Sequence, residues 1–106
     1  MKILFVKCNQ RFEKILLKDI LFIESLLNYV HVVTTDKKFI VYSSLKAMEA
    51  NLPNERFIRV HKSYIISVDQ IDAVDESQLH LKNHIVPIGR AYRHLPKEIL
   101  ARRKLQ

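Results

Sequence analysis

The stretch RFIRVHKSYII, residues 56–66, decides how the middle of this chain is interpreted. It begins and ends with apolar residues, and between them lie Arg59, His61, Lys62 and Ser63. A fully buried strand avoids charge, and a half-buried strand alternates polar and apolar side chains. The stretch is therefore predicted to be a β-strand whose polar middle faces outward, with Arg59 and His61 on the same face.

Length and composition indicate a single globular domain over residues 1–106. Apolar residues make up 48% of the chain and charged residues 27%, values typical of a soluble domain. No apolar run approaches the roughly 20 residues that cross a bilayer, and the first residues do not resemble a signal peptide. Cys8 is the only cysteine, so no internal disulfide can form. These features predict a cytoplasmic protein with no membrane contact.

Positive charge is concentrated near the C-terminus. The net charge is +7, and residues 82–106 hold seven Lys and Arg residues against one Glu. A basic cluster of this kind is typical of a surface that binds a polyanion. A solvated basic tail is the alternative that charge alone leaves open.

Short β-like runs cover most of the chain. They occupy residues 2–7, 12–17, 19–25, 28–35, 38–44 and 67–74. Within 19–25, the period of two places Ile20 and Phe22 on one face. Asp36 and Lys37 separate two runs and predict a hairpin, and residues 78–88 predict another that turns near Lys82 and Asn83.

Two segments have helical patterns instead. Residues 45–52 place apolar side chains at helical spacing, with Ser44 as a cap at the start and Pro53 as a stop. Residues 95–105 predict a terminal helix with Pro96 in its first turn. Strands and helices do not alternate, so the predicted fold is mostly β and mainly antiparallel, rather than a parallel βαβ fold.

The sequence argues against an enzyme and against a metal or cofactor site. One glycine cannot supply a P-loop or a dinucleotide fingerprint, and one cysteine excludes zinc sites built from cysteine pairs. His80 and His84 lie on either side of a predicted turn, with no third ligand nearby. His61 and Ser63 lack an orienting partner for acyl transfer. We therefore expect no cofactor and no catalytic activity.

A second basic cluster lies in PIGRAYR, residues 87–93. Gly89 allows a sharp turn after a strand, and the turn would present Arg90 and Arg93. The guanidinium group of arginine can bond to O6 and N7 of guanine together. Ordinary surface ion pairing is the alternative for both arginines, and Tyr92 is expected to pack in the core.

Three motifs together resemble the LytTR DNA-binding domain of bacterial response regulators: DILFIES with NYVHV, RFIRVHKSYIISVDQI and VPIGRAY. The resemblance covers roughly residues 3–95, and the middle motif is its most specific part. It implies an elongated fold of about ten short strands in several small sheets, with one short internal helix and a C-terminal helix. It also implies DNA binding by loops between strands, without a recognition helix.

The resemblance implies three loops that contact DNA. The first loop covers Leu26, Leu27 and Asn28. In the second, Lys62 is the candidate for a base contact, with His61 and Ser63 for phosphate or backbone contacts. In the third, Arg90 is the strongest candidate base reader, with Arg93 beside it. Arg59 and Gly89 complete the predicted contact set.

The resemblance further implies a transcription regulator of two-component type, which pairs on direct-repeat sites in double-stranded DNA. A receiver domain would accompany this effector domain in a longer protein, and a stand-alone regulator is the other possibility. Two other readings stay open from the residues themselves. One is a β-rich module that binds a protein through a basic surface, and the other is RNA binding. RNA binding is disfavoured because Tyr29, Tyr42, Tyr64 and Tyr92 all occur in strand-like contexts that predict burial.

Overall fold

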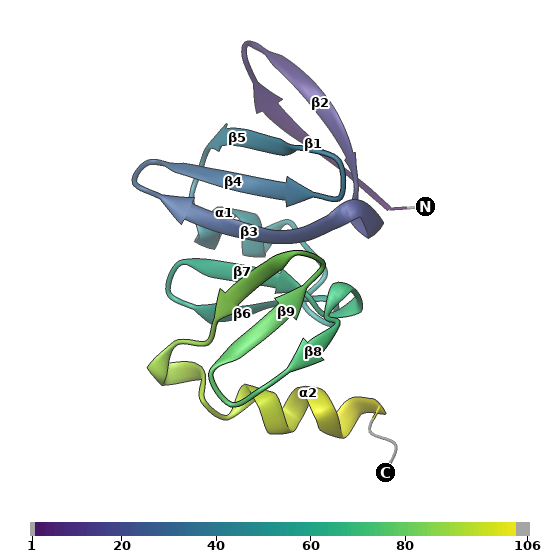
Figure 1. Cartoon of the computed structure of the whole chain (residues 1–106). Coiled ribbons are helices and arrows are strands. Elements are labelled where there is room, and N and C mark those ends of the chain that lie inside the picture. The colour runs from purple at the N-terminus through teal and green to yellow at the C-terminus, as the bar shows by residue number, and fades with distance from the viewer. Residues whose placement is uncertain (1, 104–106) are drawn as a thin grey trace.

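A computed structural model describes residues 2–103 of the protein. Within that range, ten strands form three antiparallel sheets and two α-helices accompany them (Figure 1). The molecule is elongated, with extents of 48 × 30 × 25 Å. The predicted mostly β fold, with one internal and one C-terminal helix, is confirmed.

The central sheet has five strands in the order β5-β4-β3-β7-β6. Their bounds are Ile20–Leu26 for β3, Tyr29–Thr34 for β4, Lys38–Tyr42 for β5, Phe57–His61 for β6 and Tyr64–Ser67 for β7. The hairpin predicted around Asp36 and Lys37 joins β4 to β5. The hydroxyl oxygen of Thr34 accepts hydrogen bonds from the backbone N–H groups of Asp36 and Lys37, which fixes the turn.

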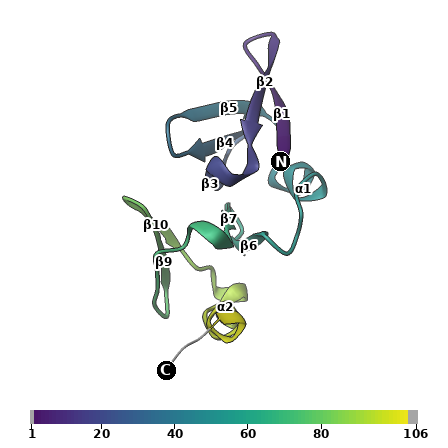
Figure 2. The ribbon, with the colours of Figure 1, turned by 90° about the vertical axis from the view of Figure 1, so that its right-hand side faces the viewer.

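Each face of the central sheet has its own hydrophobic core. The first core lies beneath the hairpin of β1 (Ile3–Cys8) and β2 (Arg11–Leu16) and beneath α1 (Leu45–Ala50). The second lies beneath the small sheet of β8 (Ala73–Val74), β9 (Gln78–Leu81) and β10 (His84–Pro87), together with α2 (Leu95–Arg103). Figure 2 shows α1 and the small sheet on opposite sides of the central strands.

Helix α1 forms where the sequence predicts it. The Ser44 side chain accepts a hydrogen bond from the backbone N–H of Ala47 at 3.1 Å, as an N-cap residue does. Leu45 and Met48 are buried in the first core. The cap and the apolar spacing together anchor a helix that is too short to be stable alone.

A β-bulge in β3 overturns the predicted facing of Ile20 and Phe22. The pairing of β3 with β4 shifts register between these two residues. Ile20 and Ile23 therefore lie in the first core, and Leu21 and Phe22 in the second. An extra residue in one strand reverses the alternation beyond it, which a strict period of two does not anticipate.

The stretch 56–66 is not one strand. It forms the hairpin of β6 and β7, and Lys62 and Ser63 make the turn between them. The pairing shifts register between Arg59 and His61, so Val60 is a bulge residue. The polar residues in the middle of the stretch, which are unusual inside a single strand, therefore lie at the end of a hairpin.

The second half of the chain confirms one prediction and corrects another. The hairpin predicted in residues 78–88 is formed by β9 and β10. Residues 67–74, predicted as one strand, instead contain the 3₁₀ turn η2 (Val68–Gln70) and the two-residue strand β8. Two further 3₁₀ turns are η1 (Leu17–Asp19) and η3 (Arg90–Tyr92). None of the helices in residues 2–103 is long and apolar enough to cross a membrane.

Candidate nucleic-acid interface

The first predicted loop is the turn between β3 and β4. Leu26 ends β3, and Leu27 and Asn28 form the turn. Leu27 has a φ of 57°, in the left-handed region that side chains other than glycine, asparagine and aspartate rarely adopt. Its side chain is 98% exposed. A leucine held in a disfavoured backbone conformation and projected fully into solvent is a candidate for contact with a partner.

The second loop is the turn that carries Lys62. The Lys62 side chain is exposed, and the backbone N–H of Ser63 donates to Nδ1 of His61 at 3.0 Å. The His61 ring also packs edge-on against Tyr64, with 5.4 Å between ring centroids. His61 is thus held by the hairpin that it terminates, while Lys62 is free to reach outward.

Arg59 stabilises the backbone of this turn from the side of the sheet that faces α1. Its Nε donates to the carbonyl oxygen of His61 at 2.9 Å, and its Nη2 donates to the carbonyl oxygen of Lys62 at 2.6 Å. Its Nη1 bonds to Glu49 of α1 at 2.8 Å. Because of the bulge at Val60, Arg59 points toward α1 and His61 toward the second core. The prediction that Arg59 and His61 share a face was wrong.

The third loop follows β10 and packs directly on the second. The backbone N–H of Gly89 donates to the carbonyl oxygen of Val60 at 2.8 Å. A Cβ on Gly89 would lie 3.2 Å from Cα of His61, closer than ordinary packing allows. Gly89 has a φ of −70°, which any residue can adopt. The absence of a side chain therefore serves close approach, not the sharp turn that the sequence suggested.

Arg90 and Arg93 project from this third loop. Both side chains are exposed, whereas Tyr92 packs against the second core as predicted. Across residues 2–103, no ion pair engages Arg90 or Arg93. Surface ion pairing, the alternative for these two arginines, therefore does not occur within the described structure.

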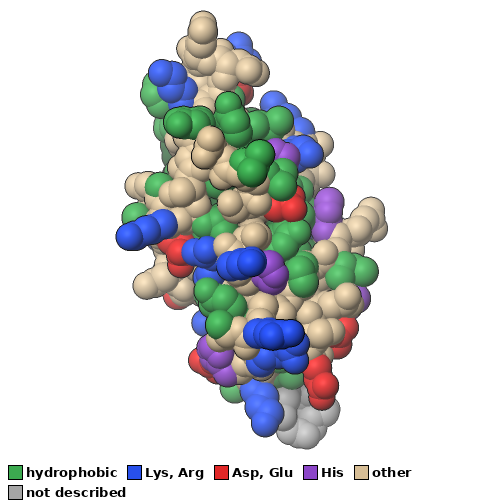
Figure 3. All heavy atoms as spheres, turned by 90° about the vertical axis from the view of Figure 1, so that its left-hand side faces the viewer, with side chains coloured by type: hydrophobic (Ala, Val, Ile, Leu, Met, Phe, Trp, Pro, Cys, Tyr) green, Lys and Arg blue, Asp and Glu red, His purple; other side chains and the backbone are tan. Residues whose placement is uncertain are grey.

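Backbone hydrogen bonds connect the three loops into one surface. The N–H of Ser25, at the end of β3, donates to the carbonyl oxygen of Ser63 at 2.9 Å, and the bond between Gly89 and Val60 joins the third loop. All three loops lie on the left of Figure 1. Figure 3, which faces that side, shows Lys and Arg side chains over its middle and lower parts, with hydrophobic side chains above them.

A partly buried polar contact supports the first two loops. The hydroxyl of Tyr64 donates to a carboxylate oxygen of Glu24 at 2.9 Å and so connects β7 to β3. Burial, and then the bond to the Glu24 carboxylate, raise the pKa of the Tyr64 phenol above its ordinary value of 10.0. The proton that makes this contact is therefore held firmly at neutral pH.

The predicted burial of all four tyrosines was wrong for two of them. Tyr29 is 47% exposed and Tyr42 is 75% exposed, and their rings meet edge to face on the central sheet. The alternation of side chains along β4 and β5 is the sequence signal for this exposure, because the neighbouring residues Val30 and Val41 are buried. Sequence reasoning missed this exposed aromatic surface.

The other polar candidates behave as structural residues. His80 bonds to Asp75 at 3.2 Å, and His84 packs edge-on against Phe22. Hydrogen bonds from Ser77, His80 and Gln78 lower the pKa of Asp75. No group of three potential metal ligands occurs in the part of the chain that the structure describes.

The basic C-terminal quarter does not form one patch. Arg90 and Arg93 lie in the third loop, but Arg102 of α2 donates to the carbonyl oxygen of Glu55 at 3.2 Å. Helix α2 extends away from the loops toward the opposite side of the molecule (Figure 1). Lys104 lies outside the described residues. The candidate interface is therefore the surface formed by the three loops, residues 26–28, 61–63 and 89–93, and not the terminal helix. We call it the three-loop surface.

Comparison with known proteins agrees with this fold. The chain is 29% identical over 89 residues to "Sensory transduction protein LytT" of Bacillus subtilis (strain 168), covering 78% of this chain and 37% of that relative. Its fold matches the solved "LytTr DNA-binding domain of putative methyl-accepting/DNA response regulator from Bacillus cereus" with a TM-score of 0.79. That match covers 94% of this chain and 97% of the other at 22% identity.

The sequence model of the LytTr DNA-binding domain family matches residues 10–101, a span that contains all three loops. The resemblance identified from the three sequence motifs is thereby confirmed. On this match, the chain belongs to the LytTr DNA-binding domain family.

Proposed function

We propose that this chain binds double-stranded DNA in a sequence-specific manner through the three-loop surface. The observation that carries the proposal is the joining of three loops, distant in sequence, by the backbone bonds of Ser25 to Ser63 and of Gly89 to Val60. Such bonding gives the loops a fixed relative position. Side chains held in a fixed register can read bases at several points, whereas independent flexible loops lose affinity to ordering.

Arg90 and Lys62 are the proposed base readers. Each is exposed, and each projects from a backbone that the neighbouring loop holds in place. The guanidinium fork of Arg90 matches the two acceptors of guanine, and the ammonium of Lys62 can donate to one of them. Leu27 offers an apolar contact to a thymine methyl group. The proposed phosphate and backbone contacts are made by His61, Ser63, Arg93 and Asn28.

Arg59 and Gly89 support binding indirectly in this proposal. The guanidinium of Arg59 is already engaged by two carbonyl oxygens and by Glu49. Gly89 lets the third loop approach His61. We therefore assign both as positioning residues, which set the places of Lys62 and Arg90.

We further propose that the domain acts as the effector part of a two-component transcription regulator. This chain spans only 37% of the length of the relative named as a sensory transduction protein, which leaves room for a receiver domain in a longer protein. Two copies would bind direct repeats about one helical turn apart, since that spacing places both on the same side of the duplex.

Selection from a pool of random duplexes tests the proposal. The bound fraction is sequenced after several rounds, and the affinity for the enriched site is then measured by fluorescence anisotropy. Arg90→Ala is expected to weaken binding by roughly 1–3 kcal/mol and to relax selection at one base pair. Lys62→Ala is expected to relax selection at another.

Arg102→Ala is the matched control, because it removes the same charge from α2. It should leave the selected motif unchanged. If no motif is enriched, or if Arg90→Ala and Arg102→Ala weaken specific and random duplexes equally, then sequence-specific reading by the three loops is wrong.

A further inference from the structure

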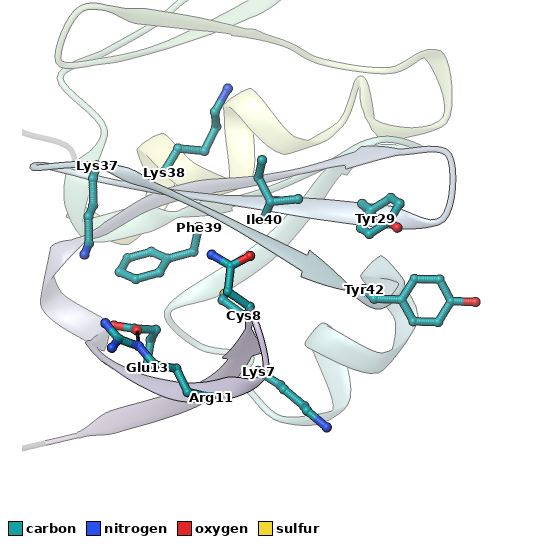
Figure 4. A pocket seen from close by; sticks show the side chains of 11 residues that line it. Lys7, Cys8, Arg11, Glu13, Tyr29, Lys37, Lys38, Phe39, Ile40 and Tyr42 are labelled. Atoms are coloured by element: carbon teal, nitrogen blue, oxygen red, sulfur yellow. Dashed lines mark hydrogen bonds and ion pairs between the residues drawn. The ribbon is translucent and has the colours of Figure 1, made fainter.

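A basic hollow lies along the unpaired edge of the central sheet, beside the β1–β2 hairpin. β5 is the terminal strand of that sheet, and no other strand in residues 2–103 is hydrogen-bonded to its outer edge. The hollow measures about 510 Å³ and lies between this edge and the tip of the β1–β2 hairpin (Figure 4). An unpaired strand edge offers a row of backbone donors and acceptors to another chain.

Side chains on both faces of β5 line the hollow. Phe39 points toward the hairpin, with the amine of Lys37 4.7 Å from its ring centroid. Lys38, Ile40 and Tyr42 lie on the other face, where Ile40 is 53% and Tyr42 is 75% exposed. A strand added at this edge would send alternate side chains to these two faces. The hollow therefore suits an extended segment better than a helix.

The rim of the hollow is basic. Lys7, Arg11, Lys37 and Lys38 contribute to it, and Glu13, its single carboxylate, pairs with Arg11. Within residues 2–103, no ion pair engages the three lysines. Lysines on an edge strand repel a second copy of the same strand. The same charges attract an acidic segment, so they favour an acidic partner over a second copy of this chain.

We propose that β5 docks an extended acidic segment of a partner protein. Backbone hydrogen bonds would extend the central sheet by one strand, as in other cases of β-strand addition. Acidic side chains would meet Lys37 and Lys38, and apolar ones would cover Ile40 and Tyr42. Nucleic acid fits this surface less well, because Tyr29 and Tyr42 lie edge to face at 69° and do not offer parallel stacking faces.

The probe is a fluorescein-labelled peptide of alternating Glu and Val, about as long as β5, titrated with the full chain. We expect saturable binding, and we expect Lys37→Glu with Lys38→Glu to weaken it about tenfold or more, because both charges are reversed. Lys14→Glu with Lys46→Glu is the matched control. It changes the net charge equally at exposed sites outside the hollow, and it should weaken binding far less.

Two control peptides test the mode of docking. Replacing Glu by Lys in the probe should abolish binding, and N-methylation of alternate amides should weaken it if backbone bonds form. Lys38→Glu alone is a second variant, since Lys38 is exposed and its loss removes no core contact. Absence of saturable binding, or equal weakening by both double variants, would overturn the proposal.

A measurement on duplex DNA separates this proposal from the proposed function. Lys37→Glu with Lys38→Glu should weaken the selected duplex no more than the control pair does. A selective loss of DNA affinity would instead place the hollow in the nucleic-acid interface and overturn the assignment of a protein partner. Failure of sequence-specific DNA binding would leave the peptide result unaffected.

Discussion

Individual side chains in this domain hold the backbone of the three loops in place more than they enlarge its charged surface. Arg59 shows this most clearly, since its guanidinium bonds to the carbonyl oxygens of His61 and Lys62 and to Glu49. Two of these acceptors belong to the backbone of the turn itself. Tyr64 has a similar role one strand away, where its hydroxyl bonds to Glu24 beneath the first loop.

Arg59→Ala is expected to impair recognition through the turn and not through lost charge. Without the brace, the turn that carries Lys62 samples more conformations, and binding must then restrict them. Affinity for the selected duplex should fall by roughly 1–2 kcal/mol, while the slope of log affinity against log salt stays unchanged. Anisotropy titrations at several salt concentrations measure both. A slope reduced by about one unit would instead identify Arg59 as a phosphate contact.

Tyr64→Phe is expected to remove an alkaline sensitivity of folding. The folded protein raises the pKa of this phenol, so the folded state holds the proton more tightly than the unfolded state. The resulting stability is fully present below pH 10.0 and is lost as the pH rises through the folded pKa. The free energy of unfolding of the variant should be lower by roughly 1 kcal/mol at neutral pH. At alkaline pH it should decline less than that of the unaltered protein. Urea unfolding across alkaline pH values tests this, and parallel declines of both proteins would contradict it.

At the scale of elements, two turns and one 3₁₀ segment form the candidate interface. The turn between β3 and β4, the turn between β6 and β7, and η3 each contribute few residues. Their relative position depends on the bonds from Ser25 to Ser63 and from Gly89 to Val60. Gly89 is the point where η3 meets the second turn, and a Cβ there would contact the backbone of His61.

Gly89→Val is expected to displace the third loop from the second. Its side chain would need space that Cα of His61 and the Tyr92 ring now occupy, at 3.2 and 3.3 Å from the Cβ position. Overpacking of this kind costs about 1–3 kcal/mol of stability, and we expect specific DNA affinity to fall as well. Ala73→Val, at an exposed strand position in β8, is the control. Full specific affinity in Gly89→Val would show that the loops act independently.

For the whole molecule, the position of a charge matters more than the total of +7. The exposed arginines without ion pairs in the described structure include Arg90 and Arg93 of the third loop. Arg102 carries the same charge but donates to the carbonyl oxygen of Glu55, on the opposite side of the domain. Net charge predicts attraction to a polyanion, whereas the fold decides which charges lie together on the candidate interface.

Arg93→Ala is expected to weaken binding to all duplexes and to lower the salt slope by about 0.9, the effect of one phosphate contact. Arg102→Ala removes an equal charge and should leave the slope unchanged, because its side chain lies away from the three loops. Anisotropy titrations between low and moderate salt give the slopes. Equal slope changes in both variants would show that binding depends on overall charge and not on the interface.

The sequence by itself determined the features that depend on neighbouring residues. The cap at Ser44 and the hairpin turns at Asp36 with Lys37 and at Lys82 with Asn83 follow from local chemistry. The family motifs likewise placed three loops on the chain before any geometry was known. Local propensity and short-range periodicity suffice here because each feature is completed within a few residues.

Tertiary structure alone decided how these features meet. The bulges in β3 and β6 change which side chains share a face, so they separated Ile20 from Phe22 and Arg59 from His61. The role of Gly89 depends on its contact with His61. Pairing between distant strands sets each of these, and a period read along one strand contains no information about its partner.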